Sequence, residues 1–275
     1  MIMSGSGSTR IFTAIVGIPL FITPMYLGGI WFTLLIAVVA AFAQIELYRL
    51  QSHLSWKPNV SAGLILGAVL ILRADIEFAT PVVLLLLVFL VLESSRQGPA
   101  GNPMARVGGT LTGVVYPALF LSFLPLIRSG LEESFGATEA FSITLFMIAL
   151  IWICDTTAYY AGRAAGKTQL APEISPNKTV EGAVAGVAGA LIAAVAARFL
   201  FFPFLSWMDV SAFALIASVI GQLGDLVESS FKRSAKVKDA GSMLPGHGGF
   251  LDRFDSIILA TPVYYLYLIM ATDYL

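Results

Sequence analysis

Apolar runs of helical length dominate the chain, and short polar stretches separate one run from the next. A helix needs about 20 mainly apolar residues to cross the hydrocarbon core of a bilayer. Nine runs are candidates, at residues 11–27, 29–49, 59–73, 77–93, 109–128, 139–162, 179–202, 208–231 and 250–271. The pattern predicts an all-α polytopic membrane protein, a bundle of about nine transmembrane helices.

Composition supports a membrane protein and argues against two classes, disulfide-framework proteins and inverted-repeat transporters. Hydrophobic residues make up 57% of the 275 residues and charged residues only 12%, whereas soluble domains carry about 25% charged residues. A single cysteine, Cys154, excludes an internal disulfide framework. The two halves show no internal repeat, which argues against an inverted-repeat transporter.

The basic residues indicate an orientation for these spans. Only Arg73, Arg128 and Arg198 fall near the side that the odd-numbered loops share. The other thirteen fall on or near the side of the N-terminus and the even-numbered loops: Arg10, Arg49, Lys57, Arg96, Arg106, Arg163, Lys167, Lys178, Lys232, Arg233, Lys236, Lys238 and Arg253. The positive-inside rule then predicts a cytoplasmic N-terminus and cytoplasmic charged loops.

Acidic residues inside the spans need a reason, because a carboxylate at membrane depth is costly. For Glu46 two interpretations stay open: a structural acid that pairs with Arg49 one turn on, or an acid with a function. The candidates are Glu46, Asp155, Glu181, Asp225, Glu228, Asp252 and Asp255. Most of them belong to the last four spans, so residues 139–275, with cytoplasmic loops 163–178 and 232–249, are predicted to carry the chemistry. Residues 1–138 are predicted to be a transmembrane scaffold of five spans.

The last two spans concentrate these acids on facing helices. Asp225, Glu228, Ser229 and Lys232 follow an i, i+3, i+4, i+7 pattern along one helix face, and Asp252 and Asp255 lie one turn apart on the next span. Converging carboxylates repel unless a cation lies between them, and oxygen ligands favour Mg²⁺. The alternative is an ion-pair network with the neighbouring residues Lys232, Arg233 and Arg253.

Two polar stretches offer groups that bind phosphate. Lys232, Arg233, Lys236 and Lys238 precede His247, which lies among Gly246, Gly248 and Gly249. Lysine and arginine beside a glycine-rich turn and Mg²⁺ suit a polyphosphate, although the basic residues alone also fit a topology signal or a contact with anionic lipid. Upstream, the stretch 175–182 resembles a turn into a helix, and a helix start at Thr179 beside Lys178 could hold a phosphate.

These stretches resemble a known family. The 27 residues from Ser229 to Asp255, SSFKRSAKVKDAGSMLPGHGGFLDRFD, are similar to the signature of the CDP-diacylglycerol synthases, and ISPNKTVEG upstream is similar to theirs as well. The resemblance is specific from about Asp155 to Asp255. It implies a phosphatidate cytidylyltransferase that uses Mg²⁺ to convert CTP and phosphatidic acid into CDP-diacylglycerol and pyrophosphate. It also implies a homodimer in the cell inner membrane, with the active site facing the cytoplasm and no nucleic acid partner.

Residue roles follow as hypotheses from the two arguments together. Asp225 and Asp252 are expected to hold the metal, with Asp255 and Ser229 as weaker ligands. Lys232 and His247 complete the predicted catalytic set, and His247 orients a phosphate or joins a second cation site, although a lone histidine is often structural. The predicted substrate contacts are Lys178, Arg233, Lys238, Gly248, Gly249 and Ser175.

Two other functions compete with this interpretation. A CTP-dependent polyprenol or phytol kinase would use the same nucleotide but would transfer its γ-phosphoryl group and release CDP. A cation or proton transporter would need acids along the whole depth of a span, yet the outer parts of the last spans, such as YYLYLIM, contain none.

Overall fold

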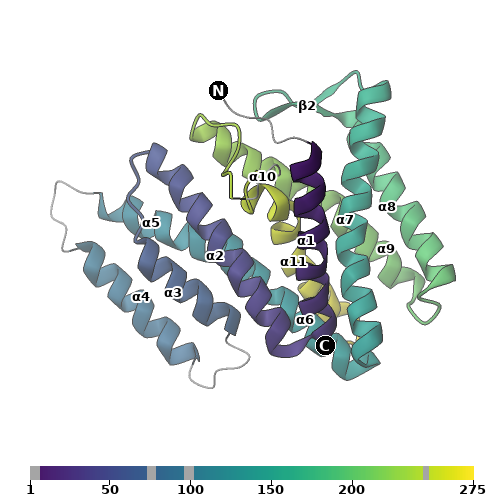
Figure 1. Cartoon of the computed structure of the whole chain (residues 1–275), viewed down its shortest axis with the longest axis horizontal. Helices are drawn as coiled ribbons and strands as arrows, with labels where there is room; N and C mark the ends of the chain where they lie inside the picture. Colours follow the sequence, from purple (N-terminus) through teal and green to yellow (C-terminus); the bar gives the residue numbers. More distant parts are fainter. Residues whose placement is uncertain (1–6, 73–78, 96–101, 244–247) are drawn as a thin grey trace. The chain divides into compact units, whose positions relative to one another are not determined.

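The computed structural model describes residues 7–72, 79–95, 102–243 and 248–275 as helices joined by short connections (Figure 1). Nine helical segments occur in this part of the chain, two of them interrupted by a π-helical stretch. Four single helices come first: α1 (Gly7–Leu27), α2 (Gly29–His53), α3 (Val60–Ile71) and α4 (Ala79–Ser95). The fifth segment joins α5 (Pro103–Gly113), η2 (Val114–Leu119) and α6 (Phe120–Phe135).

The remaining segments follow after Gly136. They are α7 (Ala137–Ala165), α8 (Val180–Leu200), the run of α9 (Trp207–Leu215), η3 (Ile216–Ile220) and α10 (Gly221–Ser234), and α11 (Leu251–Ala271). Each of the nine predicted spans coincides with one of these helical segments. The all-helical multi-pass membrane fold is therefore confirmed.

Six of the nine segments are long and apolar enough to cross a membrane by themselves. Within the described residues these are Gly29–His53, Pro103–Phe135, Ala137–Ala165, Val180–Leu200, Trp207–Ser234 and Leu251–Ala271. Three apolar stretches are shorter: Ile15–Leu27, Val60–Ile71 and Val83–Leu92. At about 1.5 Å per residue, α3 covers about 18 Å, less than the roughly 30 Å of a hydrocarbon core. The orientation of the bundle stays a prediction.

Local sequence signals explain where the helices begin and end. Gly28 (φ 66°) and Gly136 (φ 86°) adopt the left-handed conformation that permits the sharp turns before α2 and α7. Asn59 accepts a hydrogen bond from Ala62 N at the start of α3, and Asn102 accepts one from Ala105 N at the start of α5. These side chains satisfy amides that the first turn of a helix otherwise leaves without partners.

The chain divides by its internal contacts into two units. The first unit comprises Met1–Ser129 and Phe231–Phe254, and the second comprises Gly130–Ser230 and Asp255–Leu275. The predicted division into residues 1–138 and 139–275 stays a prediction, since the contact division follows other boundaries.

In the first unit, α2 packs against α1, α3 and α5, and α4 packs against α3 and α5 (Figure 1). Tyr48 of α2 donates a hydrogen bond to Thr110 O of α5 at 3.0 Å, and Gln44 donates one to Gly63 O of α3 at 3.0 Å. A side chain at Gly63 or Gly113 would overlap the Tyr48 ring. Glycine at these positions therefore permits the close approach of α3 and α5 to α2.

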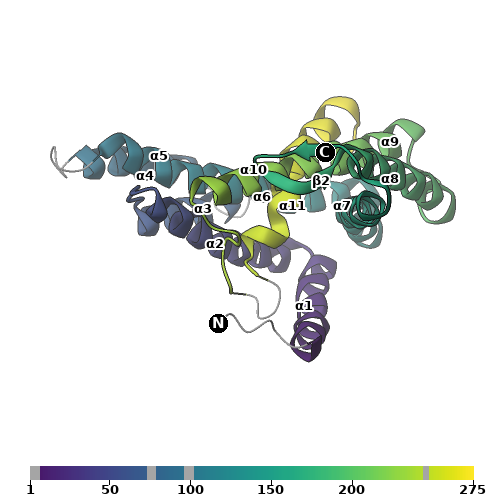
Figure 2. The ribbon, with the colours of Figure 1, turned by 90° about the horizontal axis from the view of Figure 1, so that it is seen from above.

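In the second unit, α7 and α8 form the most extensive helix pair, and Figure 2 views α7 close to end-on. Gly182 and Gly186 of α8 lie against α7, where a methyl group at 182 would be 2.7 Å from Ala158 O. Small residues at such spacing let helix backbones pack closely inside a membrane. Gln222 of α10 adds polar contacts by donating to Ser218 O at 2.7 Å and to Ala183 O at 3.3 Å.

The connection between α7 and α8 contains a feature that the hydrophobic pattern did not predict. Strands β1 (Gln169–Ala171) and β2 (Ser175–Thr179) pair antiparallel, with Gln169 opposite Thr179 and Ala171 opposite Ser175. The predicted loop 163–178 is thus the end of α7 followed by a β-hairpin. This hairpin fixes the residues that lead into α8.

Candidate functional site

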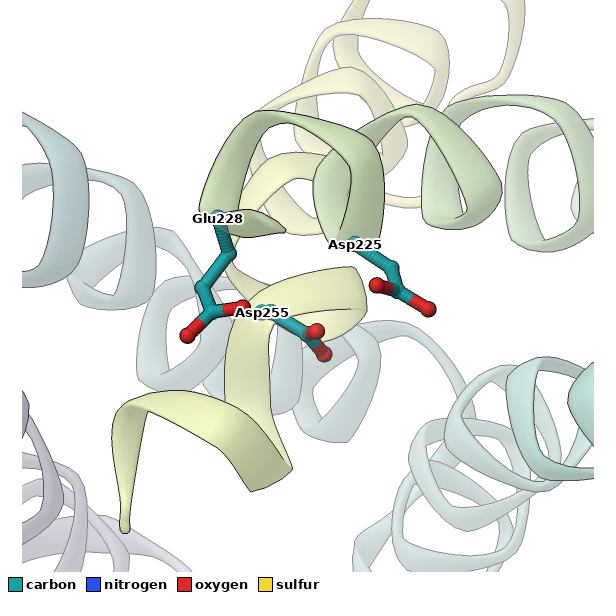
Figure 3. A group of neighbouring side chains, drawn as sticks. All are labelled: Asp225, Glu228 and Asp255. Atoms are coloured by element: carbon teal, nitrogen blue, oxygen red, sulfur yellow. The ribbon is translucent and has the colours of Figure 1, made fainter. Parts of the chain in front are cut away.

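Three carboxylates of the second unit gather between α10 and α11. Asp225 and Glu228 lie one turn apart on α10, and Asp255 lies near the start of α11 (Figure 3). One oxygen from each lies within 4.8 Å of the others. Glu228 is fully buried, whereas Asp225 and Asp255 are partly exposed. The acidic faces of the last two spans therefore meet as the helical spacing predicts.

Gly224 brings the two helices close enough to form this cluster. A methyl group at position 224 would lie 2.6 Å from Asp255 O and 3.1 Å from the Leu259 side chain. Because the nearest atom belongs to the backbone, it cannot move aside as a flexible side chain could. Glycine next to Asp225 is thus a requirement of the α10–α11 contact.

Lys178 supplies the positive charge beside the cluster. Its Nζ lies 2.6 Å from Asp225 Oδ2, and both side chains remain partly exposed. The hydroxyl of Ser229 donates to Asp225 Oδ1 at 3.2 Å, and Asp155 of α7 interacts electrostatically with both Asp225 and Lys178. Asp225 is therefore the point where a basic residue, a hydroxyl and other acids converge.

The hairpin holds Lys178 in place. Lys178 is the penultimate residue of β2, and the next residue, Thr179, caps α8 by accepting a hydrogen bond from Gly182 N at 3.1 Å. Glu181 accepts hydrogen bonds from Lys167 N at 3.1 Å and from the Thr168 hydroxyl at 3.0 Å. Thr179 is the N-cap and α8 begins at Val180, in agreement with the predicted helix start. Its first turn is tied to the hairpin through these side chains.

Gly162 and Gly166 belong to the stretch GRAAGK (residues 162–167) at the end of α7, and both have a packing role. A methyl group at Gly162 would lie 2.9 Å from the Thr179 hydroxyl oxygen, and one at Gly166 would lie 2.6 Å from Thr179 Cγ2. Both glycines thus make room for the residue that caps α8. The stretch superficially resembles a phosphate-binding loop but lacks the full spacing of that motif, so packing is the role that these glycines have in the structure.

The first unit contains a second group of predicted residues, centred on Asp252. Lys232 Nζ lies 2.8 Å from Asp252 Oδ1, and both side chains are only 12% exposed. Ala240 N and Gly249 N donate to Asp252 Oδ2 at 3.1 Å and 3.0 Å. Both oxygens of Asp252 are therefore engaged, one by an ammonium group and the other by two amides.

The remaining predicted substrate contacts differ in their exposure and in their partners. Arg233 is exposed and donates to Val237 O at 3.2 Å, Lys238 is exposed, and Ser175 begins β2. Gly248 adopts φ 84°, and Gly249 is the amide donor to Asp252. His247 lies outside the described residues.

Glu228 is the acid of the cluster that the predicted metal set omitted. Its position one turn after Asp225 on the same helix face was visible in the sequence, and this spacing was the signal for including it. The cluster offers only carboxylate oxygens, which hard divalent cations prefer. Together with Lys178, it can bind a cation and an anion side by side.

Comparison with known proteins places the chain among enzymes that transfer cytidylyl groups. A profile described as the cytidylyltransferase family matches residues 8–271. A phosphatidate cytidylyltransferase of Bacillus subtilis (strain 168) is 35% identical over 273 residues, which cover 95% of this chain and 97% of that protein.

Two further relatives carry the same name and are similar over comparable lengths. The protein of Synechocystis sp. is 31% identical over 288 residues, covering 95% of this chain and 96% of the relative. The protein of Brucella abortus biovar 1 is 35% identical over 266 residues, covering 94% and 92%. The match of the family profile and these near-full-length similarities show that the chain belongs to the cytidylyltransferase family.

Proposed function

We propose that this membrane protein is a phosphatidate cytidylyltransferase, which makes CDP-diacylglycerol from CTP and phosphatidic acid. In this reaction, a phosphate oxygen of phosphatidic acid bonds to the α-phosphorus of CTP. The bond from that phosphorus to the bridging oxygen of the β-phosphate breaks, and pyrophosphate leaves. The observation that carries the proposal is the similarity to phosphatidate cytidylyltransferases over nearly the whole chain.

The described residues fit a divalent cation. Asp225, Glu228 and Asp255 offer one carboxylate oxygen each within 4.8 Å of one another, and all-oxygen donor sets suit Mg²⁺. Bound there, Mg²⁺ would neutralise phosphate charge and polarise phosphate oxygens. Ser229 remains a further candidate ligand of this ion, and Asp252 of the first unit remains a candidate ligand of a divalent cation. Asp252 would have to release Lys232 to serve in this way.

The basic residues are proposed to bind phosphates. Lys178 and Lys232 each form an ion pair with a carboxylate, at 2.6 Å and 2.8 Å, which orients the ammonium groups before substrate arrives. Because phosphatidate is already an anion, the reaction needs no strong general base. The main tasks are to reduce repulsion between two anions and to align them in line. Arg233, Lys238, Ser175, Gly248, Gly249 and His247 complete the proposed substrate contacts.

The substrates also bear on location and assembly. CTP is water-soluble and phosphatidate has two acyl chains, so the site must be accessible from both water and lipid. We place it on the cytoplasmic face of the inner membrane, since the basic loops lie on the side predicted to be inside. The family resemblance also supports a homodimer.

One assay separates this function from its competitors. Detergent-purified protein is incubated with labelled CTP, phosphatidic acid and Mg²⁺, and the lipid fraction is examined for label. We expect a labelled CDP-lipid together with pyrophosphate, and no product without Mg²⁺. Release of CDP with a phosphorylated polyprenol would instead identify a lipid kinase. Ion-driven transport in liposomes without CTP turnover would identify a transporter.

A further inference from the structure

Glu46 lies far in sequence from the stretch 229–255 but contacts part of that stretch within the first unit. It belongs to α2 and is fully buried. Its Oε2 accepts a hydrogen bond from Leu251 N at 2.8 Å, across 205 residues of sequence. Leu251 is the first residue of α11, so its amide has no acceptor within that helix. Glu46 therefore supplies the acceptor that the start of α11 requires.

Two glycines border the same carboxylate, and an aromatic pair lies one turn away on α2. A methyl group at Gly241 would overlap the Glu46 carboxyl group, and one at Gly249 would lie 2.5 Å from its Oε2. One turn earlier on α2, Phe42 stacks on Phe250 with ring centroids 4.8 Å apart and planes inclined by 20°. Phe42 and Glu46 thus hold two consecutive residues, Phe250 and Leu251, against the same face of α2.

Packing alone does not account for an acid at this position. Glu46 Oε1 is buried and accepts no hydrogen bond from the described residues. A buried carboxylate that is incompletely hydrogen-bonded reduces stability, so an apolar side chain of similar size would pack at lower cost. Sites that reduce stability in this way are often functional.

The segments that Glu46 contacts are the ones that hold Asp252. Ala240 N, immediately before Gly241, and Gly249 N both donate to Asp252 Oδ2. Asp252 in turn pairs with Lys232 at 2.8 Å. A shift of Gly241 or Gly249 away from Glu46 would therefore displace the amides that orient Asp252.

We propose that Glu46 is a positioning residue, which holds the segments 240–241 and 248–251 so that the Asp252–Lys232 pair keeps its geometry. The proposal extends the predicted role of the N-terminal region, because a residue of α2 then controls a pair in the signature. Its kinetic consequence, weaker binding of a nucleoside triphosphate, rests on the proposed function. Its structural consequence does not.

The structural test measures hydrogen exchange in the full-length, detergent-purified protein. Glu46→Leu removes the acceptor, Glu46→Gln keeps one, and Gln44→Leu is the control, since Gln44 is equally buried on α2 but bonds Gly63 O of α3. We expect amide exchange in residues 248–252 to accelerate about tenfold or more in Glu46→Leu and less in Glu46→Gln. Gln44→Leu should leave it unchanged. Equal exchange in all four proteins would overturn the proposal.

The kinetic test separates positioning from a general loss of folded protein. If CTP binds only when the segments are held, its apparent affinity falls with the fraction of molecules in that state. We expect the KM for CTP to rise about tenfold in Glu46→Leu, with kcat changed less than about threefold and Glu46→Gln close to wild type. A lower kcat at unchanged KM would mark a merely structural role and contradict the proposal. Wild-type protein that does not use CTP would refute the proposed function, yet the exchange result would still decide the role of Glu46.

Discussion

Single carboxylates determine whether the cluster between α10 and α11 can hold a cation. Three carboxylates within 4.8 Å repel one another when ionised, and the full burial of Glu228 reduces the screening of its interactions by water. A bound divalent cation removes this repulsion. Each carboxylate should therefore contribute to cation affinity, including the one that the predicted metal set omitted.

Replacing Glu228 by glutamine tests this contribution. The change keeps the size of the side chain but removes one negative charge and one strong ligand. We expect the Mg²⁺ concentration for half-maximal activity to rise at least about tenfold, because even groups that only support metal ligands cost about 10- to 100-fold in affinity. This concentration is measured by titrating the purified protein with Mg²⁺ in the activity assay. Glu139→Gln, an exposed acid in the first turn of α7, is the control and should leave the titration unchanged.

The ion pair of Lys178 with Asp225 makes a second prediction at this scale. If the two residues act together, Lys178→Met and Asp225→Asn should each lower kcat/KM, and the double variant should lose less than the sum of the two effects. In a double-mutant cycle of this kind, residues in contact show a coupling free energy of about 0.5–3 kcal/mol. The cycle is read from the kcat/KM for CTP of the four proteins.

A second cycle with an exposed hairpin residue provides the control. Glu173 lies in the turn between β1 and β2 and is exposed. Lys178→Met combined with Glu173→Gln should be additive within about 0.5 kcal/mol. Additive effects in the Asp225 cycle as well would show that the observed ion pair has no part in activity.

Residue spacing predicted only some of these neighbours. Asp225 and Glu228 share a helix face by their separation of three, and the contact between α10 and α11 brings Asp255 to that face. The partners of Lys178 and Glu46 depend instead on how distant segments pack. Leu251 is 205 residues from Glu46, and no local pattern encodes such a contact.

At the scale of elements, one glycine sets the approach of α10 to α11. Gly224→Ala would place a methyl group 2.6 Å from Asp255 O, a backbone atom. Forcing extra volume into a packed contact typically costs about 1–3 kcal/mol. We expect a lower unfolding temperature in detergent and a higher Mg²⁺ requirement, since the helices must separate where the acids meet.

Gly108 of α5 offers the matched control for this substitution. A methyl group there would meet no atom within 4 Å, and the residue is helical. Gly108→Ala should leave the Mg²⁺ requirement unchanged and leave stability equal or slightly higher, because alanine favours helix more than glycine by up to about 1 kcal/mol. Equal effects of the two substitutions would rule out the close contact as the cause.

The hydrophobic pattern predicted the helices better than their irregularities. All nine spans were recognised because long apolar runs have few alternatives in a membrane. The π-helical stretch Val114–Leu119 contains Pro117, which lacks an amide donor and disturbs the regular ladder locally. The β-hairpin after α7 depends on a two-strand pairing of a few residues, too short to produce a clear alternation.

At the scale of the whole molecule, the distribution of charge predicts which ends of the helices face the cytoplasm. Thirteen basic residues against three favour a cytoplasmic position for the β-hairpin and an outer position for the turn between α6 and α7. Glu173 lies in the hairpin and Glu133 lies near the end of α6, and both side chains are exposed. The only native cysteine, Cys154, is buried, so it leaves a low background for thiol labelling.

This asymmetry makes labelling of single introduced cysteines a direct test of orientation. In spheroplasts treated with a membrane-impermeant maleimide, Glu133→Cys should react at once, and Glu173→Cys should react only after permeabilisation. The protein without either substitution should stay unlabelled, because a buried thiol is shielded from the reagent. The result bears on function as well as topology, since CTP is found in the cytoplasm and Lys178 sits on the hairpin beside Asp225. Labelling of Glu173→Cys in intact spheroplasts would put Lys178 on the side that lacks the nucleotide, and the proposed reaction could not take place there.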